Sequence, residues 1–527
     1  MTTRQRWTLV ATIIGSGVVF LDGTIVNVAL PRIGSELPSS VIGLYEGQTY
    51  IVSGYLAVLA ALLILAGALS DHFGRRRVFA IGLASFAGTS VLCGLAPTLE
   101  LIVVFRLLQG AAGALLVPGS LSIITQTFEG PARARAFGLW ASATSALAIL
   151  GPITGGVLVD GAGWRVAFLM NVPLIAVALW ATRRHVEESR AEASSGHFDW
   201  LGSVVATLAV GGLAFGVIRG EQNAWADPIA WISLGIGAIA LVAFPILMAR
   251  RPYPLVPLEL FRSRAFATIN IATFFIYGAL YITQSYQVLV LQGVLGYTAT
   301  AAGAVGLPIA IMLTLLSARV GTLAGRMGAR PFLVAGPWLM ALGLLWLARI
   351  PADSAPWQAA IGEPATLVPP TDTLIDVLPA MLLFGLGIAL LVAPLTSTLM
   401  SSIPSARSGL GSAINNAISR VGAPLIGALI FIAVSATFYS VLGSLTDLDT
   451  ASADVRATFA PLNPPKGTAT EAEIGAARQA SIDAFHQAML VSAALLAVGG
   501  AVSLVGLRGT RAGDEPVAER SPEPAAG

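Results

Sequence analysis

Long apolar runs separated by short polar segments make up most of the chain. A helix needs about 20 apolar residues to cross a bilayer, and by that criterion the sequence holds fourteen such runs. We therefore expect helices at roughly 7–30, 49–69, 77–96, 99–121, 135–159, 166–182, 200–218, 229–249, 266–288, 300–320, 331–349, 377–399, 410–438 and 485–507. The pattern predicts an all-α integral membrane protein with fourteen transmembrane helices.

Two polar linkers, 183–199 and 250–265, flank the seventh and eighth runs, so the chain reads as six helices, two helices and six helices. A long segment at 439–484 interrupts the last six helices and is expected to be an outer loop. The predicted units are an N-terminal lobe at 1–182, two additional helices with their linkers at 183–265, a C-terminal lobe at 266–507 and a tail at 508–527. The composition of the tail is typical of disorder.

Composition agrees with a chain that is solvated by lipid. The sequence is 55% hydrophobic and 11% charged, with a mean hydropathy of +0.79, whereas soluble domains carry roughly 25% charged residues. This excludes a soluble or nucleic-acid-binding role. Because the N-terminus has no small-residue cleavage site after its apolar run, we expect the segment from Trp7 onward to be a retained first helix.

The sequence gives no sign of a metal, a cofactor or an enzymatic site. The single cysteine, Cys93, rules out an intrachain disulfide, and the four histidines lack metal-ligand spacing. Paired carboxylates, a Ser/His set, channel-type rings of charge and a GxxxxGK[ST] phosphate loop are not found. We expect a protein that is not an enzyme and does not use ATP directly.

Arginine is distributed unevenly between alternate loops. With a cytoplasmic N-terminus, most arginines fall in inside segments and few fall in outside segments, as the positive-inside rule requires. The sequence therefore predicts a multi-pass protein of the cytoplasmic membrane with both termini in the cytoplasm.

Asp22 is the one acid among 28 that falls well inside a predicted helix. Counting residues from the outer helix ends puts Asp22 roughly 12 Å deep and Arg106 roughly 10 Å deep, so the two charges are expected to meet. Burial favours the protonated carboxyl, whereas a nearby guanidinium favours the charged one. The pair is a candidate proton switch, and the alternative is a permanent structural ion pair.

A loop repeats weakly between the two halves. The segment 67–77 reads GALSDHFGRRR after the second predicted helix, and 321–330 reads GTLAGRMGAR after the second helix of the last six. Related loops at matched positions are typical of a transporter built from two repeated lobes. Gly74 suits a tight turn in the first copy.

Four motifs together resemble the major facilitator superfamily, in particular its fourteen-helix drug:proton antiporter branch. They are LDGTIVNVALP at 21–31, the loop at 67–77, RLLQG at 106–110 and GPITGG at 151–156. The resemblance runs from about Trp7 to about Gly506. The chain departs from the branch at Ala112, where glycine is usual, and at 46–50, where a tryptophan-containing stretch is usual.

The resemblance implies a fold of two six-helix lobes plus two extra helices, with helices 1 and 4 lining a central cavity. It implies a gating role for the cytoplasmic loop, carried by Gly67, Asp71, Gly74, Arg75, Arg76 and Arg77. The alternative for the arginines is ordinary positive-inside charge. Small residues and a proline at Gly151, Pro152, Gly155 and Gly156 suit a close lobe–lobe contact, and routine helix packing is the alternative.

Polar and aromatic side chains within the predicted helices are candidates for a substrate cavity, because buried amides need partners and aromatic faces suit flat or cationic compounds. These candidates are Asn27, Tyr55, Gln109, Trp140, Tyr277, Tyr281, Gln284, Asn415 and Asn416. Some of them are expected to be packing residues. For Arg420, an anionic substrate, a helix end and a lipid headgroup all remain open as partners.

The expected function is proton-coupled export of small apolar or cationic compounds by alternating access, as in multidrug efflux. The alternative is a dedicated exporter of one endogenous compound, such as an antibiotic, a lipid or an amino acid. We expect small molecules, protons and membrane lipid as partners, no cofactor beyond the proton gradient, and a monomer.

Overall fold

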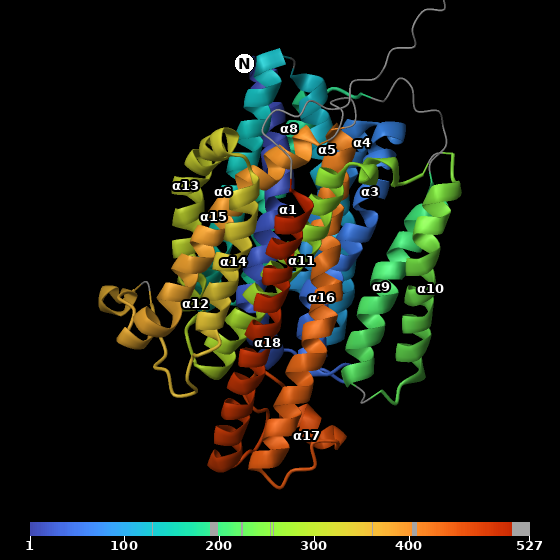
Figure 1. The fold of residues 1–527 in the computed structure, drawn as a ribbon. Coiled ribbons are helices and arrows are strands. Elements are labelled where there is room, and N and C mark those ends of the chain that lie inside the picture. The colour runs from blue at the N-terminus through green and yellow to red at the C-terminus, as the bar shows by residue number, and fades with distance from the viewer. Residues whose placement is uncertain are drawn as a thin grey trace, which may run out of the picture.

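The computed structural model describes residues 1–128, 130–189, 199–222, 225–252, 254–256, 258–360, 362–402 and 408–508. These residues form helices joined by turns, without a strand among them (Figure 1). The predicted tail lies almost wholly outside the described residues.

The N-terminal lobe contains six long helical segments, two of which are broken by irregular turns. Its elements are α1 (Thr3–Glu36), α2 (Leu44–Thr49), the π-helical turn η1 (Tyr50–Gly54), α3 (Tyr55–Phe73), α4 (Arg75–Gly94), α5 (Leu99–Thr127), α6 (Gly130–Ala162), α7 (Trp164–Leu169) and α8 (Asn171–His185). The additional helices are α9 (Trp200–Gln222) and α10 (Pro228–Arg250).

The C-terminal lobe has the same plan. Its elements are η2 (Leu258–Arg262), α11 (Arg264–Leu289), η3 (Val290–Val294), α12 (Ala299–Ala304), α13 (Leu307–Met327), α14 (Arg330–Leu347), η4 (Pro364–Leu367), η5 (Thr373–Val377), α15 (Leu378–Ser401), α16 (Ser408–Leu445), α17 (Ala453–Thr458) and α18 (Glu471–Gly506).

Twelve helical stretches of the described chain are long and apolar enough to cross a membrane. The protein is therefore a multi-pass membrane protein. The predicted count of fourteen also requires α3 and α6, which include residues whose side chains the structure does not describe. That count stays a prediction.

Helix pairing repeats between the two lobes. In the first lobe α1 packs on α6 and α8, and α5 packs on α3 and α4. In the second lobe α11 packs on α16 and α18, and α15 packs on α13 and α14. Each pair in one lobe has its counterpart at the matching position in the other. The lobes meet through α6 on α12 and α3 on α16, which are also equivalent pairs.

The repeated loop has a glycine with a positive φ angle in both copies. Gly74, between α3 and α4, has φ +108°, and Gly328, between α13 and α14, has φ +85°. Side chains are strained at such angles, so glycine ends one helix and lets the next begin at once. The turn predicted at Gly74 is present, and its counterpart supports the internal repeat.

The additional helices lie side by side at the edge of the molecule, where α9 packs against α3 of one lobe and α16 of the other (Figure 1). Their outward residues are large and apolar: Ile232, Ile239 and Val242 are each more than 60% exposed. Exposed apolar side chains on a membrane helix are suited to contact with lipid tails. The pair therefore covers the seam between the lobes from the lipid side.

The prediction of an outer loop at 439–484 is largely wrong, because much of this segment is helical. Helix α16 continues to Leu445, a short helix α17 follows, and α18 begins at Glu471. A capping box between Thr470 and Glu473 starts α18, and alanine, glutamate and glutamine favour helix in its first turns. The apolar-run criterion measures the thickness of the membrane, so it misses helical turns that extend beyond it.

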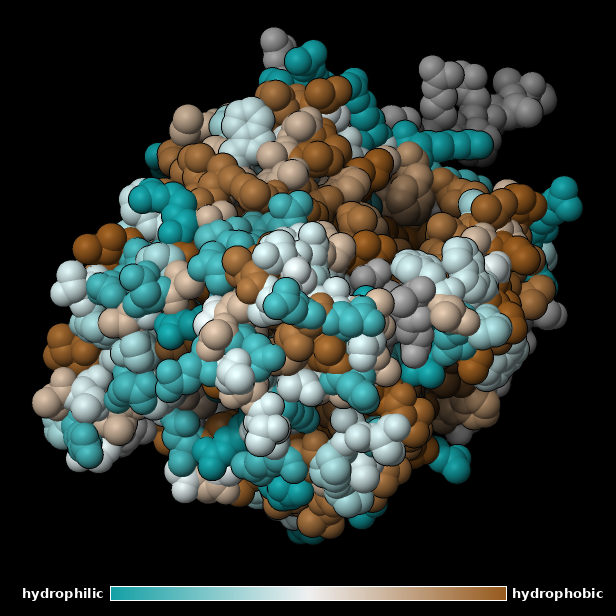
Figure 2. All heavy atoms as spheres, turned by 90° about the horizontal axis from the view of Figure 1, so that it is seen from below, coloured by the Kyte–Doolittle hydropathy of each residue, from teal (hydrophilic) through white to brown (hydrophobic). Residues whose placement is uncertain are grey.

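We call the end of the molecule that carries α17 the outer end, following the orientation predicted from the arginines. Figure 2 views the molecule from this end. Hydrophilic residues spread over much of the face, and hydrophobic residues gather toward parts of its rim.

Candidate functional site

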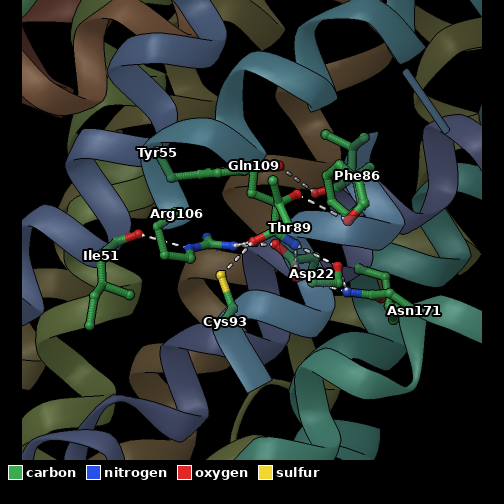
Figure 3. A network of polar contacts seen from close by, with 12 residues as sticks. Asp22, Ile51, Tyr55, Phe86, Thr89, Cys93, Arg106, Gln109 and Asn171 are labelled. Atoms are coloured by element: carbon green, nitrogen blue, oxygen red, sulfur yellow. Dashed lines mark hydrogen bonds and ion pairs between the residues drawn. The ribbon is translucent and has the colours of Figure 1, made fainter. Parts of the chain in front are cut away.

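Asp22 of α1 lies at the centre of a buried polar network (Figure 3). Its side chain is 1% exposed, and its Oδ2 accepts a hydrogen bond from Nη1 of Arg106 at 2.5 Å. Its Oδ1 accepts from the amide of Gln109 at 3.2 Å and from the amide of Asn171 at 3.0 Å. The structure thus brings together the acid and the base whose depths agree in the sequence. Three donors from two other helices, α5 and α8, stabilise the carboxylate.

Arg106 of α5 ties the acid to the second helical segment of the lobe. Its Nε donates to the carbonyl of Ile51 at 3.1 Å, and its Nη1 also donates to Gln109 at 2.7 Å. The guanidinium lies 4.0 Å from the ring centroid of Tyr55. Ile51 belongs to the π-helical turn η1, and such turns are common at functional sites because they disturb the regular backbone bonding.

The network includes residues that sequence analysis did not select. Asn171, at the start of α8, donates to Asp22, and Ser90 of α4 accepts from Gln109 at 2.8 Å. Asn171 lies seven residues after Trp164, so the same depth count that paired Asp22 with Arg106 also applies to it. The depth count was applied to charged residues only, and the amides selected as cavity candidates did not include Asn171.

Asp22 can carry a proton or form an ion pair with Arg106, but it cannot do both at once. A protonated Asp22 has a neutral carboxyl, so its bond to Arg106 loses the ionic part. Arg106 keeps its bonds to Ile51 of η1 and to Gln109 of its own helix α5. A change in the charge of one buried carboxyl is thus transmitted to α1, α5 and η1 together.

The remaining cavity candidates do not join this network. Asn27 accepts from Ser285 of the other lobe at 3.0 Å. Asn415 donates to Asn270 and Thr273 of α11 at 3.1 and 3.0 Å, so its amide packs helices within one lobe. Both contacts satisfy the hydrogen-bonding groups of buried side chains, which is the usual structural role of buried amides.

Tyr277, Tyr281 and Gln284 are half-buried along one side of α11, and the two tyrosine rings are 6.2 Å apart. Asn416 of α16 is also half-buried. Trp140 lies elsewhere, beside a small cluster formed by Leu9, Ile124, Phe128 and Ala136.

The loop at 67–77, predicted to be cytoplasmic, is held by the linker that follows α8. The carboxylate of Glu188 accepts from the backbone N–H groups of Arg76 and Arg77, both at 3.1 Å, and the Arg75 N–H donates to the Ser189 carbonyl. An acid at the N-terminus of α4 is favoured by the unpaired N–H groups there. The side chain of Asp71 lies outside the described residues, and Gly67 faces Pro118. The gating role stays a prediction.

The GPITGG segment of α6 has two packing faces. Gly151 and Gly155 lie against Thr24 and Ile25 of α1. A Cβ at Gly156 would lie 2.5 Å from the carbonyl oxygen of Ala299 in α12. One face therefore joins α6 to its own lobe, and the other lets α6 approach the second lobe at backbone distance.

Among the residues that the structure describes, the hydrogen bonds between the lobes lie in the outer half of the molecule. Asp160, at the end of α6, accepts from the backbone N–H and the hydroxyl of Thr300, both at 2.7 Å. Gln48 and Asn463 exchange two amide hydrogen bonds of 2.8 Å, and both residues are buried. We call these contacts the outer seam. In this structure the outer seam is closed.

A second buried acid fastens the additional helices. Glu46, in the stretch where the sequence departs from its branch, is fully buried and lies 3.5 Å from Nη1 of Arg219 in α9. Arg219 also contacts Asp227, at 2.9 Å, in the turn before α10. One ion-pair cluster thus joins the N-terminal lobe, α9 and the α9–α10 turn.

Comparison with known proteins gives one consistent family. The sequence matches the Major Facilitator Superfamily over residues 12–428. It is 33% identical to the multidrug resistance protein Stp of Mycobacterium tuberculosis, over 94% of this chain and 91% of that protein. It is 32% identical to the tetracenomycin C resistance and export protein of Streptomyces glaucescens, over 79% of this chain and 74% of that protein.

Among solved structures, the fold is similar to a bacterial homologue of the human lysosomal transporter Spinster in an inward-facing, unoccupied conformation. The TM-score is 0.63 at 16% identity, over 96% of this chain and 97% of that one. At that identity the likeness bears on the fold alone.

Proposed function

Because the chain belongs to the major facilitator superfamily, we propose that it exports small molecules in exchange for protons, with Asp22 as the residue that carries the proton. The chain is a membrane transporter of small molecules and not an enzyme. The export direction is supported by the names of its relatives, which describe multidrug resistance and antibiotic export.

The buried Asp22–Arg106 pair carries the proposal. An ion pair that is 1% exposed on both sides is held in a medium where a change of charge has large effects. When Asp22 takes a proton, the neutral carboxyl holds Arg106 less strongly, and α1 is freed to move relative to α5 and η1. When the proton leaves, the pair reforms. The energy source is the proton gradient, and the protein needs no other cofactor.

The exchange proceeds by alternating access of two lobes. The outer seam closes the outer entrance in this structure, and opening it requires separation of α6 from α12 and of Gln48 from Asn463. The predicted orientation, with both termini in the cytoplasm, makes the opposite end the entry side for an exported compound. We propose that the protein functions as a monomer in the cytoplasmic membrane.

Transport in inverted membrane vesicles tests this function. An acid-inside gradient should drive uptake of rhodamine 123 or fluorescein, and a protonophore should abolish it. Asp22→Asn removes the charge at nearly constant shape and should abolish gradient-driven uptake. Glu36→Gln, at the outer end of the same helix, is the control and should retain it. Full uptake by a well-expressed Asp22→Asn protein would disprove the role of Asp22.

A dedicated exporter is the second candidate, because the tetracenomycin relative is named for one antibiotic. A panel of unrelated dyes and antibiotics in the same vesicles separates the two functions. Gradient-driven uptake of many members indicates multidrug efflux, and uptake of one chemical group indicates a dedicated exporter.

A further inference from the structure

The buried charges that the structure describes are paired, with one exception. Five charged side chains of the described residues are buried: Asp22, Glu46, Arg106, Asp199 and Arg420. The first and third of these form the central ion pair, and Glu46 pairs with Arg219. Arg420 is 4% exposed and has no carboxylate partner within the part of the chain that the structure describes.

The remaining buried acid, Asp199, also has polar partners. Asp199 accepts from the backbone N–H of Gly202 at 2.8 Å and of Leu255 at 3.2 Å, and Arg251 lies 3.9 Å away. Four buried charges therefore have an opposite charge or several donors around them. A buried guanidinium with neither an opposite charge nor a hydrogen-bond acceptor is costly, so its site is suited to an anion from outside the chain.

Arg420 lies where the two lobes meet. It belongs to α16 of the second lobe, and its guanidinium carbon is 5.2 Å from the ring centroid of Phe20 in α1 of the first lobe. Phe20 precedes Asp22 by two residues in α1, the helix that carries the central acid. The side chain is thus held next to the coupling network by an element of the opposite lobe.

The contact with Phe20 leaves the hydrogen-bonding edge of Arg420 available. A cation–π contact is made with the ring face and does not occupy the N–H donors with hydrogen-bond acceptors. These donors make no hydrogen bond to any residue that the structure describes. A planar fork of donors matches two oxygens of a carboxylate, sulfonate or phosphate.

We propose that Arg420 binds the acidic oxygen group of the transported compound, with Phe20 against its apolar or aromatic part. The inference rests on the proposed export function and adds to it one substrate class, anionic and largely apolar compounds. The charges of Asp22 and Arg106 compensate each other, so the charge that a substrate meets here is the positive charge of Arg420. Substrate and proton then occupy separate sites, and their exchange is coupled through the movement of the two lobes.

Binding of two dyes with one scaffold and opposite charge tests this site. Fluorescein is an anion and rhodamine 123 a cation, and both are xanthenes whose binding is read by fluorescence polarisation. The purified full-length protein is placed in phosphatidylcholine nanodiscs without a proton gradient. Arg420→Gln should weaken fluorescein binding about 10-fold or more, the size expected for a charge-assisted bond, and leave rhodamine 123 unchanged.

Two variants separate binding from folding. Arg420→Lys keeps the charge but loses the fork and should weaken fluorescein binding less than Arg420→Gln. Arg326→Gln removes an exposed arginine of the same lobe and should bind both dyes as the wild type does. Equal fluorescein binding by wild type and Arg420→Gln, equal loss of both dyes, or no fluorescein binding by the wild type would each overturn the proposal.

A lipid headgroup offers the same acidic oxygens, and one further arm separates the sources. Adding phosphatidylglycerol, whose headgroup has a net negative charge, to the nanodiscs should displace fluorescein if Arg420 binds an anionic lipid headgroup, and should leave binding unchanged if it binds a soluble anion. Comparing vesicle transport with dye binding tests the proposed export function separately from the anion site at Arg420. If vesicles export dye equally with Arg420→Gln and wild type, the site is wrong and the function stands. If Arg420→Gln loses binding but vesicles transport neither dye, the function is wrong and the site stands.

Discussion

At the scale of single residues, the centre of the protein depends on mutual compensation of two buried charges. Asp22 and Arg106 are each about 1% exposed and bond to each other and to Gln109. Removing one member leaves the other charge buried without its partner, which costs far more than removing both.

We predict that Arg106→Gln lowers the free energy of unfolding by about 3–5 kcal/mol. The double variant Asp22→Asn, Arg106→Gln should recover most of that loss, because two neutral amides can bond to each other. Thermal unfolding of the purified variants measures both effects. Neither variant should transport.

Equal stability losses for Arg106→Gln and for the double variant would contradict this account of the pair. They would indicate that Arg106 stabilises the lobe through Ile51 and Tyr55, independently of Asp22.

Asp160 is the residue-scale test of the outer seam. Its carboxylate binds the N-terminal N–H groups of α12, where negative charge is favoured. We predict that Asp160→Ala weakens the closed seam and increases labelling of a single cysteine at position 27, introduced by Asn27→Cys in a Cys93→Ser background. Impermeant maleimide applied from outside whole cells gives the rate. An unchanged rate would exclude Asp160 as a seam residue.

At the scale of elements, glycines decide how closely α6 approaches the second lobe. A Cβ at Gly156 would lie 2.5 Å from the Ala299 carbonyl oxygen, whereas a Cβ at Gly161 of the same helix meets nothing within 4 Å. The two positions are five residues apart in one helix and therefore form a matched pair.

We predict that Gly156→Ala opens the outer seam and slows transport, because backbone of α12 cannot yield as a flexible side chain does. Gly161→Ala should leave both unchanged. Labelling at position 27 and vesicle uptake are the measurements. Wild-type behaviour of Gly156→Ala would mean that α6 and α12 do not form the seam.

The elements also show what sequence can and cannot predict. Each of the fourteen apolar runs coincides largely with helix, because membrane thickness sets a minimum length for an apolar helix. The runs at 77–96, 331–349 and 485–507 extend slightly past the observed helix ends. The extension of α16 to Leu445 and the start of α18 at Glu471 were missed, because a polar helical turn outside the membrane carries no such signal.

The site was predictable to a similar extent. Residue depth identifies Asp22 and Arg106 as neighbours, since charge is rare in the membrane. Asn171 lies at a depth that the same count would find, but as neutral residues Asn171 and Ser90 are not singled out by charge. The missing partner of Arg420 is invisible in sequence, because pairing depends on how two lobes pack.

At the scale of the whole molecule, the two lobes are joined at the outer end and share matched helix pairs. Alternating access requires this outer seam to open in each cycle. The reciprocal amide pair of Gln48 and Asn463 marks two positions, one in each lobe, that must separate.

We predict that a short bismaleimide between Gln48→Cys and Asn463→Cys, in a Cys93→Ser background, stops transport. Each single-cysteine variant treated with the same reagent is the control and should remain active. Vesicle uptake before and after cross-linking measures the effect. Continued uptake by fully cross-linked protein would show that the outer seam does not open during the cycle.

Proton release by the purified protein tests the central claim most directly. Addition of rhodamine 123 or fluorescein to detergent-solubilised protein in weakly buffered solution should release protons from the wild type and from Glu36→Gln. Asp22→Asn should release none while remaining folded. Equal proton release by Asp22→Asn and wild type would contradict the assignment of the coupled proton to Asp22.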